Sequence, residues 1–378
     1  AAVARRARAF PRRPGARREL SGSVGAMPRP FEARGVWPAL ATPFTDDGTL
    51  DLARYDQLVR FAVAQGVTGV LPCGTTGESP TLSWEEHDTL VSRAIEVVGD
   101  ACGVLAGTGS NNTQEAIRGT DDARRLGASA ALLVDCYYNG PSSLELRTEY
   151  YERVLKAVPD IPIVPYIIPA RSGCALGAED LAILHLTDPA RVPAVKQATG
   201  DLDRMRYDRE LCGRTLAILS GDDDLTLPMM NDPAIQASGV ISVMANLVPR
   251  ALADMVGARA NGDVGEAGRI ASEIGPLLKI VGVRAHGTRR LPDGRALRVE
   301  DKFRNPVPLK TMMAGLGMIG SYCRRPLGPM PKAAVDVCRG ALRAVWEAAP
   351  EHLRPIEEHY GVRIPERLAD DSVWPTTV

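Results

Sequence analysis

The sequence lacks the features of a membrane protein and of a nucleic-acid binder. No apolar run approaches the roughly 18–20 residues that a membrane-spanning helix needs. Basic and acidic side chains nearly balance, at 45 and 46, and leave a formal net charge of −1. Such a balance gives no general attraction to nucleic acid or to an anionic membrane surface. We therefore expect a soluble, cytoplasmic protein whose partner is a small molecule.

Cysteine and histidine are present, but not in the patterns of a disulfide framework or a metal site. The count of seven cysteines is odd, and no C-x-x-C pair occurs, which argues against disulfides and zinc. The five histidines include no pair spaced by four residues, and the acidic run "GDDD" at 221–224 lacks the spacing of an oxygen-ligated metal site. We expect reduced, buried thiols and no metal.

Residues 1–26 differ from the rest of the chain. They hold seven arginines against the single acidic residue Glu19, and they lack the apolar centre of a secretory signal. A transit peptide, a disordered arm, or sequence upstream of a start at Met27 would each fit this composition. We favour the last, because Met27 shortly precedes the first strand. The segment is interpreted as a disordered, Arg-rich leader outside the fold.

From residue 36 onward, short apolar runs typical of buried strands alternate with amphipathic helical patterns. Parallel strands need crossover helices, so eight such units over about 220 residues favour an α/β fold of the (β/α)8 TIM-barrel type. An open doubly wound sheet is the competing fold, but the turn "PFTDDGTLD" lacks the G-x-G-x-x-G of nucleotide-binding sheets. We place the catalytic barrel at 27–250. The expected strands are 36–44, 69–74, 102–109, 131–138, 162–168, 192–199, 215–223 and 239–246.

Beyond residue 250 the pattern is helical, which predicts a C-terminal helical appendage at 251–348. Within it, the segment 283–304 is polar, basic and turn-rich, as expected of an inserted hairpin or loop. The last segment, 349–378, contains proline and glutamate and is weakly periodic, and we expect a C-terminal tail there.

Polar side chains gather at the ends of the expected strands, where a barrel places its active site. "CGTTGES" ends the second strand, "CYYNG" the fourth and "YIIPARSG" the fifth, and a lysine stands in the sixth within "VPAVKQATG". Each signal alone has an ordinary structural explanation, and their shared position indicates a site. The candidate residues are Thr75, Thr76, Tyr137, Tyr138, Tyr166, Arg171 and Lys196.

Lys196 is the centre of the chemical argument. It shares a strand face with Ala194, and burial of that face lowers the pKa of an amine because desolvation disfavours its charged form. A neutral amine condenses with a ketone to give an iminium. Glycine-flanked hydroxyls suit a small carboxylate, phenols pass protons, and Arg171 is suited to a second carboxylate. The set predicts a lysine imine of a 2-oxo acid such as pyruvate, formed without a cofactor, whose enamine attacks an aldehyde.

The motifs also carry a family resemblance. "GTTGES", "AGTGSNNTQEAI", "YYNGPS", "YIIPARSG", "VKQATGDL", "LSGDDD", "GVISVMAN" and "NPVPLK" appear in this order. From about residue 34 to about residue 345 the chain resembles the dihydrodipicolinate synthases, within the pyruvate-dependent aldolase and lyase superfamily. The resemblance implies a lyase that condenses pyruvate with L-aspartate 4-semialdehyde to 4-hydroxy-tetrahydrodipicolinate. That reaction is the first committed step toward diaminopimelate and lysine.

The resemblance also assigns roles to individual positions. It implies that Lys196 forms the Schiff base with pyruvate, and that Tyr166 is the general acid and base, passing protons through Thr75 to Tyr138. In the family the residue at Tyr138 reaches the neighbouring subunit's site, which implies a homotetramer built from dimers. The implied substrate-binding positions are Thr76, Arg171, Gly221 and Ile241.

Inhibition by lysine is a separate hypothesis drawn from the resemblance. Regulated members bind lysine at a dimer interface, whereas Pro80 departs from their pattern. Ile167 stands where the family has asparagine, which leaves the aldehyde preference open. The positions that match the lysine site are His87, Asn111, Glu115, Tyr137 and Trp84.

Two alternatives stay open at this point. Another pyruvate-forming class I aldolase, or a sugar-acid dehydratase, would share the barrel and the lysine, although Arg171 favours an aldehyde that carries a carboxylate. A non-catalytic paralogue kept as a binding or assembly protein would typically lack Lys196 or Tyr166, and both are present.

Overall fold

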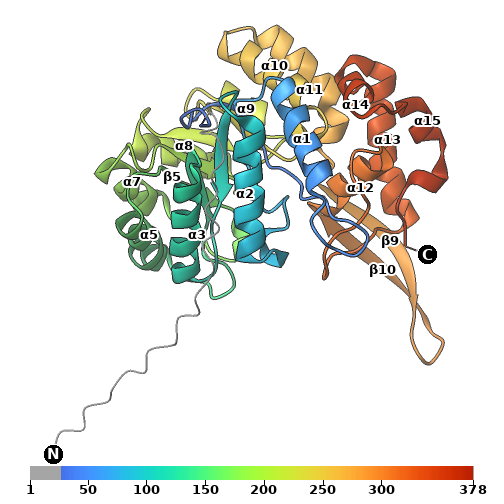
Figure 1. The fold of residues 1–378 in the computed structure, drawn as a ribbon, viewed down its shortest axis with the longest axis horizontal. Helices are drawn as coiled ribbons and strands as arrows, with labels where there is room; N and C mark the ends of the chain where they lie inside the picture. The colour runs from blue at the N-terminus through green and yellow to red at the C-terminus, as the bar shows by residue number, and fades with distance from the viewer. Residues whose placement is uncertain (1–26, 378) are drawn as a thin grey trace, which may run out of the picture.

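The computed structural model describes residues 27–377, so the leader interpreted at 1–26 lies outside the described residues. Eight parallel strands form one sheet in the order β1-β8-β7-β6-β5-β4-β3-β2. A parallel bridge from Ala39 to Leu71, just past β1 and β2, joins the two ends of this sheet, and helices surround it (Figure 1). The predicted (β/α)8 barrel is confirmed. The strands are β1 (Gly35–Pro38), β2 (Gly69–Val70), β3 (Gly103–Gly107), β4 (Ala130–Val134), β5 (Ile163–Ile167), β6 (Ala194–Gln197), β7 (Ala217–Ser220) and β8 (Gly239–Ser242).

Alternation along the strands divides the apolar core in two. Successive side chains of a strand point to opposite faces of the sheet. Leu132 and Ala194 belong to the cluster inside the barrel, whereas Leu133 and Val195 belong to the larger cluster between strands and helices. Lys196, two residues after Ala194, therefore points into the barrel.

The helices between the strands begin and end where the local sequence supplies caps. Ser83 and Glu86 form a capping box at the start of α2. Asn112 caps α3, which ends at Gly127 with a left-handed φ of 95°. The segments that follow β1 to β7 are α1 (Leu52–Ala64), η1 (Ser79–Thr81), α2 (Trp84–Val98), α3 (Thr113–Leu126), α4 (Ser143–Glu145), η2 (Leu146–Tyr151), α5 (Glu152–Ala157), α6 (Pro169–Ser172), α7 (Ala178–Thr187), α8 (Leu202–Cys212) and α9 (Thr226–Asn231).

The barrel extends past the boundary predicted at residue 250. After β8 and the short turn η3 (Met244–Asn246), helix α10 (Pro249–Ala260) packs against β1. It is thus the eighth helix of the barrel, and the predicted boundary is wrong. Consecutive helical patterns begin at this point, and the pattern alone does not show which of them covers the sheet.

Three further helices form the predicted C-terminal appendage: α11 (Val264–Leu278), α12 (Val307–Gly315) and α13 (Lys332–Ala348). Their buried side chains belong to the same core cluster as the barrel helices. No helix within residues 27–377 combines the length and the apolar character that crossing a membrane requires.

The prediction of a tail at 349–378 is wrong for the part that the structure describes. This segment folds back beside α12 and α13 (Figure 1), and Leu368 and Trp374 are buried. Trp374 lies over Gly315, where a Cβ would come within 2.4 Å of the indole ring. The helices are too short to show a helical period in the sequence. They are η4 (Pro350–His352), α14 (Arg354–Tyr360), α15 (Ile364–Ala369) and η5 (Asp371–Val373).

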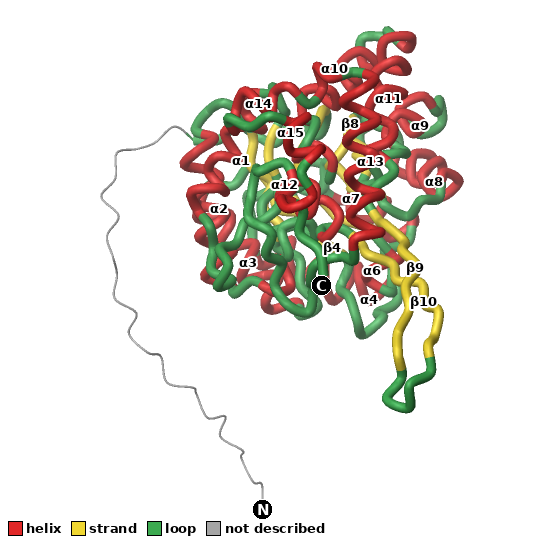
Figure 2. The backbone as a smooth tube through the Cα atoms, turned by 90° about the vertical axis from the view of Figure 1, so that its right-hand side faces the viewer, coloured by secondary structure: helices red, strands yellow, loops and turns green. Residues whose placement is uncertain are grey.

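The segment 283–304, expected as a hairpin or a loop, forms a hairpin. β9 (Gly282–Arg290) pairs antiparallel with β10 (Ala296–Arg304). β9 contacts α13 and β10 contacts α12 at the base, while the far end projects clear of the body (Figure 2).

Candidate active site

Lys196 lies inside the barrel, as its strand position predicts. The residue is only 5% exposed, and its Nζ lies 4.1 Å from the centroid of the Tyr166 ring on the paired strand β5. Burial lowers the pKa of the amine to about 8, against the opposing charges of Asp222 and Asp223. About a tenth of Lys196 is therefore uncharged at pH 7, far more than of an ordinary lysine, and available as a nucleophile.

Tyr166 has the opposite shift and the complementary role. Burial raises the pKa of its phenol to about 12, although the charge of Arg171 and a hydrogen bond with Thr75 favour the ionised form. The phenol therefore keeps its proton at neutral pH and is placed to donate it. Lys196 offers an electron pair and Tyr166 a proton within one site, which is the pairing that acid–base catalysis on a carbonyl requires.

The loop after β2 supplies the two adjacent hydroxyls, but they face different partners. Thr75 lines the cavity described below, whereas Thr76 is buried and its Oγ1 accepts a hydrogen bond of 3.0 Å from Asn305 Nδ2. Asn305 begins the "NPVPLK" motif and lies far from Thr76 in the chain. Sequence reasoning did not identify it as part of the site.

Glu78 anchors the loop that carries Thr75 and Thr76. Its carboxylate is buried, pairs with the buried amine of Lys310, and accepts a hydrogen bond of 2.8 Å from the backbone N–H of Arg324. Lys310 also donates to the carbonyl of Thr42 at 3.0 Å. The pair ties the threonine loop to α12, and the sequence analysis did not foresee it, because nothing in the spacing of the two motifs marks them as partners.

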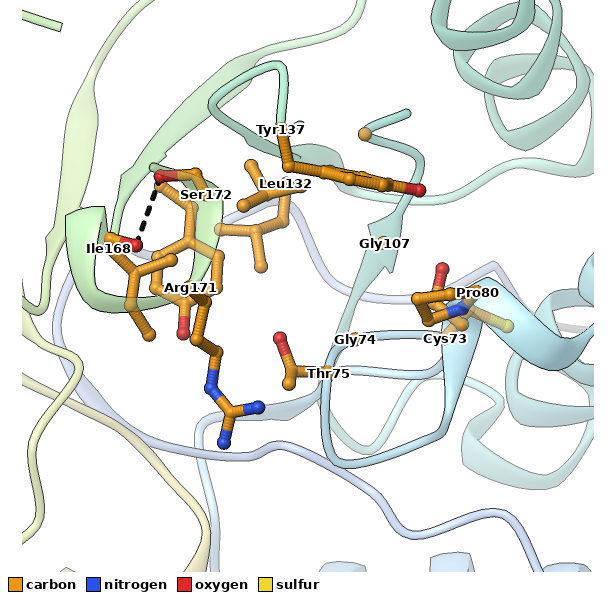
Figure 3. A pocket seen from close by; sticks show the side chains of 14 residues that line it. Cys73, Gly74, Thr75, Pro80, Gly107, Leu132, Tyr137, Ile168, Arg171 and Ser172 are labelled. Carbon is orange, nitrogen blue, oxygen red and sulfur yellow. Dashed lines mark hydrogen bonds between the residues drawn. The ribbon is translucent and has the colours of Figure 1, made fainter. Parts of the chain in front are cut away.

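A cavity of about 190 Å³ opens from Thr75 and Tyr166 toward Tyr137. Figure 3 shows the Thr75 hydroxyl facing the space between Arg171 and the Tyr137 ring. Lys196 does not line this cavity and lies instead against the Tyr166 ring. The lining residues are Cys73, Gly74, Thr75, Ser79, Pro80, Gly107, Gly109, Leu132, Val134, Tyr137, Tyr166, Ile168, Arg171 and Ser172.

Arg171 lies at the cavity wall on the four-residue helix α6 and is exposed. Its Nη2 donates a hydrogen bond of 2.9 Å to the carbonyl oxygen of Asn305. Desolvation and the neighbouring charge of Arg304 lower its pKa, but the guanidinium stays charged at any physiological pH. It is thus a fixed cation beside a cavity with few other charges, as expected of a carboxylate clamp.

Gly221, Ile241 and Asp222 surround the lysine from the β7 and β8 side. A Cβ on Gly221 would lie 2.7 Å from Ala198 Cβ and 3.1 Å from Lys196 Cε, so any larger residue would collide with Ala198 and crowd the lysine. Ile241 belongs to the cluster inside the barrel. Asp222 Oδ2 is buried and has no hydrogen-bond partner among residues 27–377. Sequence reasoning considered this acidic run only as a metal site and missed its electrostatic effect on Lys196.

Tyr138 is not among the residues that line the cavity beside Thr75. Tyr138 is 89% exposed and has a left-handed φ of 81°. Its neighbour Tyr137 turns toward the cavity instead (Figure 3). The side chain of Tyr138 is therefore directed to the surface and not into the cavity.

The five candidate lysine-site residues lie beside the outer part of the cavity. Trp84 and His87 have ring centroids 4.8 Å apart, and His87 Nε2 is hydrogen-bonded to Ser79, which lines the cavity. Burial and the charge of Glu115 raise the pKa of Tyr137, which also meets the backbone of Asn111. Two groups thus form, Trp84 with His87 and Tyr137 with Asn111 and Glu115.

One group within the described part of the chain has the composition of a metal site. Ligand atoms of Glu273, Glu351 and His352 lie within 4.8 Å of one another, on α11 and η4. His352 Nε2 already has a partner in Glu273 Oε2 at 2.8 Å. The group takes no part in the Lys196 site.

The comparisons with known proteins agree with this geometry. The model of the dihydrodipicolinate synthetase family matches residues 32–344. The 4-hydroxy-tetrahydrodipicolinate synthase of Methanothrix thermoacetophila is 42% identical over 79% of this chain and 92% of its own length. Chloride-inhibited dihydrodipicolinate synthase of Acinetobacter baumannii, complexed with pyruvate, superimposes with a TM-score of 0.73 at 31% identity, covering 83% of this chain and 99% of the other. For the enzyme of Cyanidioschyzon merolae with lysine bound, the TM-score is 0.73 at 30% identity, covering 82% and 98%. The chain belongs to the dihydrodipicolinate synthetase family.

Proposed function

We propose that the chain is a 4-hydroxy-tetrahydrodipicolinate synthase, a lyase that joins pyruvate to L-aspartate 4-semialdehyde through an imine on Lys196. The observation that carries this proposal is a lysine buried inside the barrel with its Nζ 4.1 Å from the centroid of the buried Tyr166 ring. Burial lowers the pKa of this amine to about 8 and raises the pKa of the phenol to about 12. Among the relatives, a solved structure of the A. baumannii enzyme contains pyruvate.

The first steps follow from the two side chains. The neutral amine of Lys196 attacks the keto carbon of pyruvate, and the Tyr166 phenol protonates the departing hydroxyl, so that water leaves and the imine forms. The phenolate left on Tyr166 then takes a methyl proton, which gives an enamine and restores the phenol. The enamine attacks the aldehyde carbon and forms the new C–C bond, while the aldehyde oxygen takes the proton of Tyr166 and becomes a hydroxyl. The amino group of the semialdehyde then attacks the imine carbon, closes the ring and frees Lys196.

The two carboxylates of the reactants have separate binding groups. Thr75 and the backbone of its glycine-flanked loop suit the carboxylate of pyruvate, as does Thr76. Arg171 suits the carboxylate of the semialdehyde. A sugar acid offers no second carboxylate to Arg171, which favours the semialdehyde over the aldolase and dehydratase alternatives.

Subunit assembly and regulation extend the proposal. The exposed Tyr138 suits a dimer in which it completes a partner's site, and pairs of dimers would form a homotetramer. Lysine inhibition is proposed at the outer cavity beside Tyr137 and His87, because a related enzyme has lysine bound. A cytoplasmic location is proposed because all seven cysteines are free.

Trapping of the imine tests the central step. Pyruvate and borohydride should add a reduced three-carbon adduct to Lys196 that mass spectrometry locates, and Lys196→Arg should lose it. A coupled assay with L-aspartate 4-semialdehyde should then give turnover well above that with sugar acids. An adduct on another lysine, or faster turnover of sugar acids, would overturn the proposal.

A further inference from the structure

The base of the β9–β10 hairpin, here called the hairpin root and represented by Arg304 and Asn305, lies against the active site. Its second strand ends at Arg304, directly before Asn305. Arg304 Nη1 donates a hydrogen bond of 3.0 Å to the carbonyl oxygen of Ala170. Ala170 lies in α6 and precedes Arg171, and Figure 2 shows the hairpin base beside α6. A segment that stands between the family motifs therefore touches the turn that carries Arg171.

Outside contacts add to the internal hydrogen bonds of the short helix α6. It has four residues, and backbone N–H groups of Arg171 and Ser172 donate to Ile168. So short a helix has little stability of its own. Besides the contact from Arg304, the side chain of Arg171 donates to the carbonyl of Asn305 at 2.9 Å. On the other side, the backbone N–H of Tyr138 donates to the carbonyl of Ser172 at 3.3 Å. The turn is thus held between the hairpin root and the Tyr138 loop.

The charge of Arg304, like its hydrogen bond, favours binding of a carboxylate at Arg171. Arg304 and Arg171 are both exposed cations on one rim, close enough for the charge of Arg304 to act on Arg171. The two guanidinium groups repel each other, and a carboxylate bound to Arg171 offsets part of that repulsion. The outer half of the hairpin has further cations, such as Arg290 and Arg298, whereas the hydrogen bond from the hairpin to α6 comes from Arg304.

We propose that Arg304 is a positioning residue for the second substrate, holding α6 so that Arg171 meets the carboxylate of the aldehyde. This inference rests on the proposed function, because that function assigns the carboxylate to Arg171. Pyruvate is bound elsewhere, by Lys196 and the Thr75 loop. At the hairpin root, Asn305 bonds to Thr76, whereas the side chain of Arg304 bonds to α6. The side chain of Arg304 therefore acts on the second substrate and not on pyruvate.

Steady-state kinetics of Arg304→Ala test the assignment. We expect the KM for L-aspartate 4-semialdehyde to rise about three- to tenfold, as for the loss of one exposed, charge-assisted hydrogen bond. The KM for pyruvate, kcat and the yield of trapped imine should stay within about twofold. Arg304→Lys, which keeps a cation and a donor, should recover most of the loss. Arg290→Ala removes the same charge near the hairpin tip and should leave both KM values unchanged.

A variant with a shortened hairpin distinguishes the effect of the hairpin root from that of its outer half. His286 and Glu300 face each other across the strands, so an Asn-Gly turn can join them and remove the outer half. This variant keeps Arg304 and should keep the KM for the semialdehyde. If the shortened hairpin raises that KM as much as Arg304→Ala does, the contact of Arg304 with α6 is not what positions Arg171.

Two further results would reject either the role of Arg304 or the proposed function. An unchanged semialdehyde KM in Arg304→Ala, or equal rises for both substrates, would overturn the positioning role and leave the proposed function standing. If the unaltered chain forms the pyruvate imine but does not turn over the semialdehyde, the proposed function itself fails, and the assignment of Arg304 fails with it.

Discussion

At the residue scale, the amine of Lys196 sets the pH dependence of the first chemical step. Only the neutral amine attacks the ketone, and burial places its pKa at about 8. The neutral fraction therefore rises about tenfold per pH unit below 8 and levels off above it, whereas an ordinary lysine would continue to rise to about pH 10. We expect the rate of imine formation, followed by quenching with borohydride, to follow the first curve. A rate that still increased tenfold between pH 9 and 10 would contradict it.

A variant of Asp222 tests the direction in which the midpoint of that pH curve moves. Its negative charge favours the protonated amine and raises the pKa of Lys196 against the effect of burial. Asp222→Asn should therefore move the midpoint of the pH curve to lower pH. A midpoint that moved upward would show that another group controls the titration.

Gly221 defines how little room the lysine has. In Gly221→Ala the new methyl would lie 2.7 Å from Ala198 Cβ and 3.1 Å from Lys196 Cε, so the chain near Ala198 must shift and the lysine must give by a few tenths of an ångström. Because a 1 Å misplacement costs about 100-fold in rate, we expect a smaller loss, of about two- to tenfold, in imine formation. Gly257→Ala on α10 is the matched control, because nothing lies within 4 Å of its Cβ. It should keep full activity.

At the scale of elements, the buried pair of Glu78 and Lys310 joins the threonine loop to α12. Removing one partner leaves the other charge buried without compensation, so Lys310→Met should lower the free energy of unfolding by about 3–5 kcal/mol. The double variant with Glu78→Gln should recover part of the loss. Urea unfolding of the four proteins of this cycle measures the coupling. Strictly additive losses would show that the pair does not interact.

The elements also show what the sequence can predict. The eight strands were predictable, because a parallel sheet covered by helices needs short apolar runs such as that around Val195. The contact of Asn305 with Thr76 was not, since the two are 229 residues apart and meet only when the barrel closes. The helices around Leu368 and Trp374 escaped prediction because each is shorter than two helical periods. Position on a strand end found Lys196, Tyr166 and Arg171, whereas their supports come from tertiary packing.

At the scale of the whole molecule, the placement of Tyr138 bears on the proposed assembly of subunits. Tyr138 is 89% exposed, yet its backbone is tied to α6 at the cavity wall. An exposed tyrosine held in a left-handed conformation beside a site is better explained by a partner surface than by solvent. Under the proposed function, each Tyr138 serves the site of a second subunit.

Complementation between inactive variants tests this arrangement. Lys196→Ala lacks the nucleophile, and Tyr138→Phe should lower kcat by about 10- to 100-fold through loss of a proton relay. In a mixed dimer, the site that keeps Lys196 receives Tyr138 from the partner. Random reassembly of equal amounts should therefore restore about 25% of the original activity, since half of the dimers are mixed and each has one intact site. If Tyr138 acts within its own chain, no mixed site is intact and the reassembled sample stays as inactive as its parents.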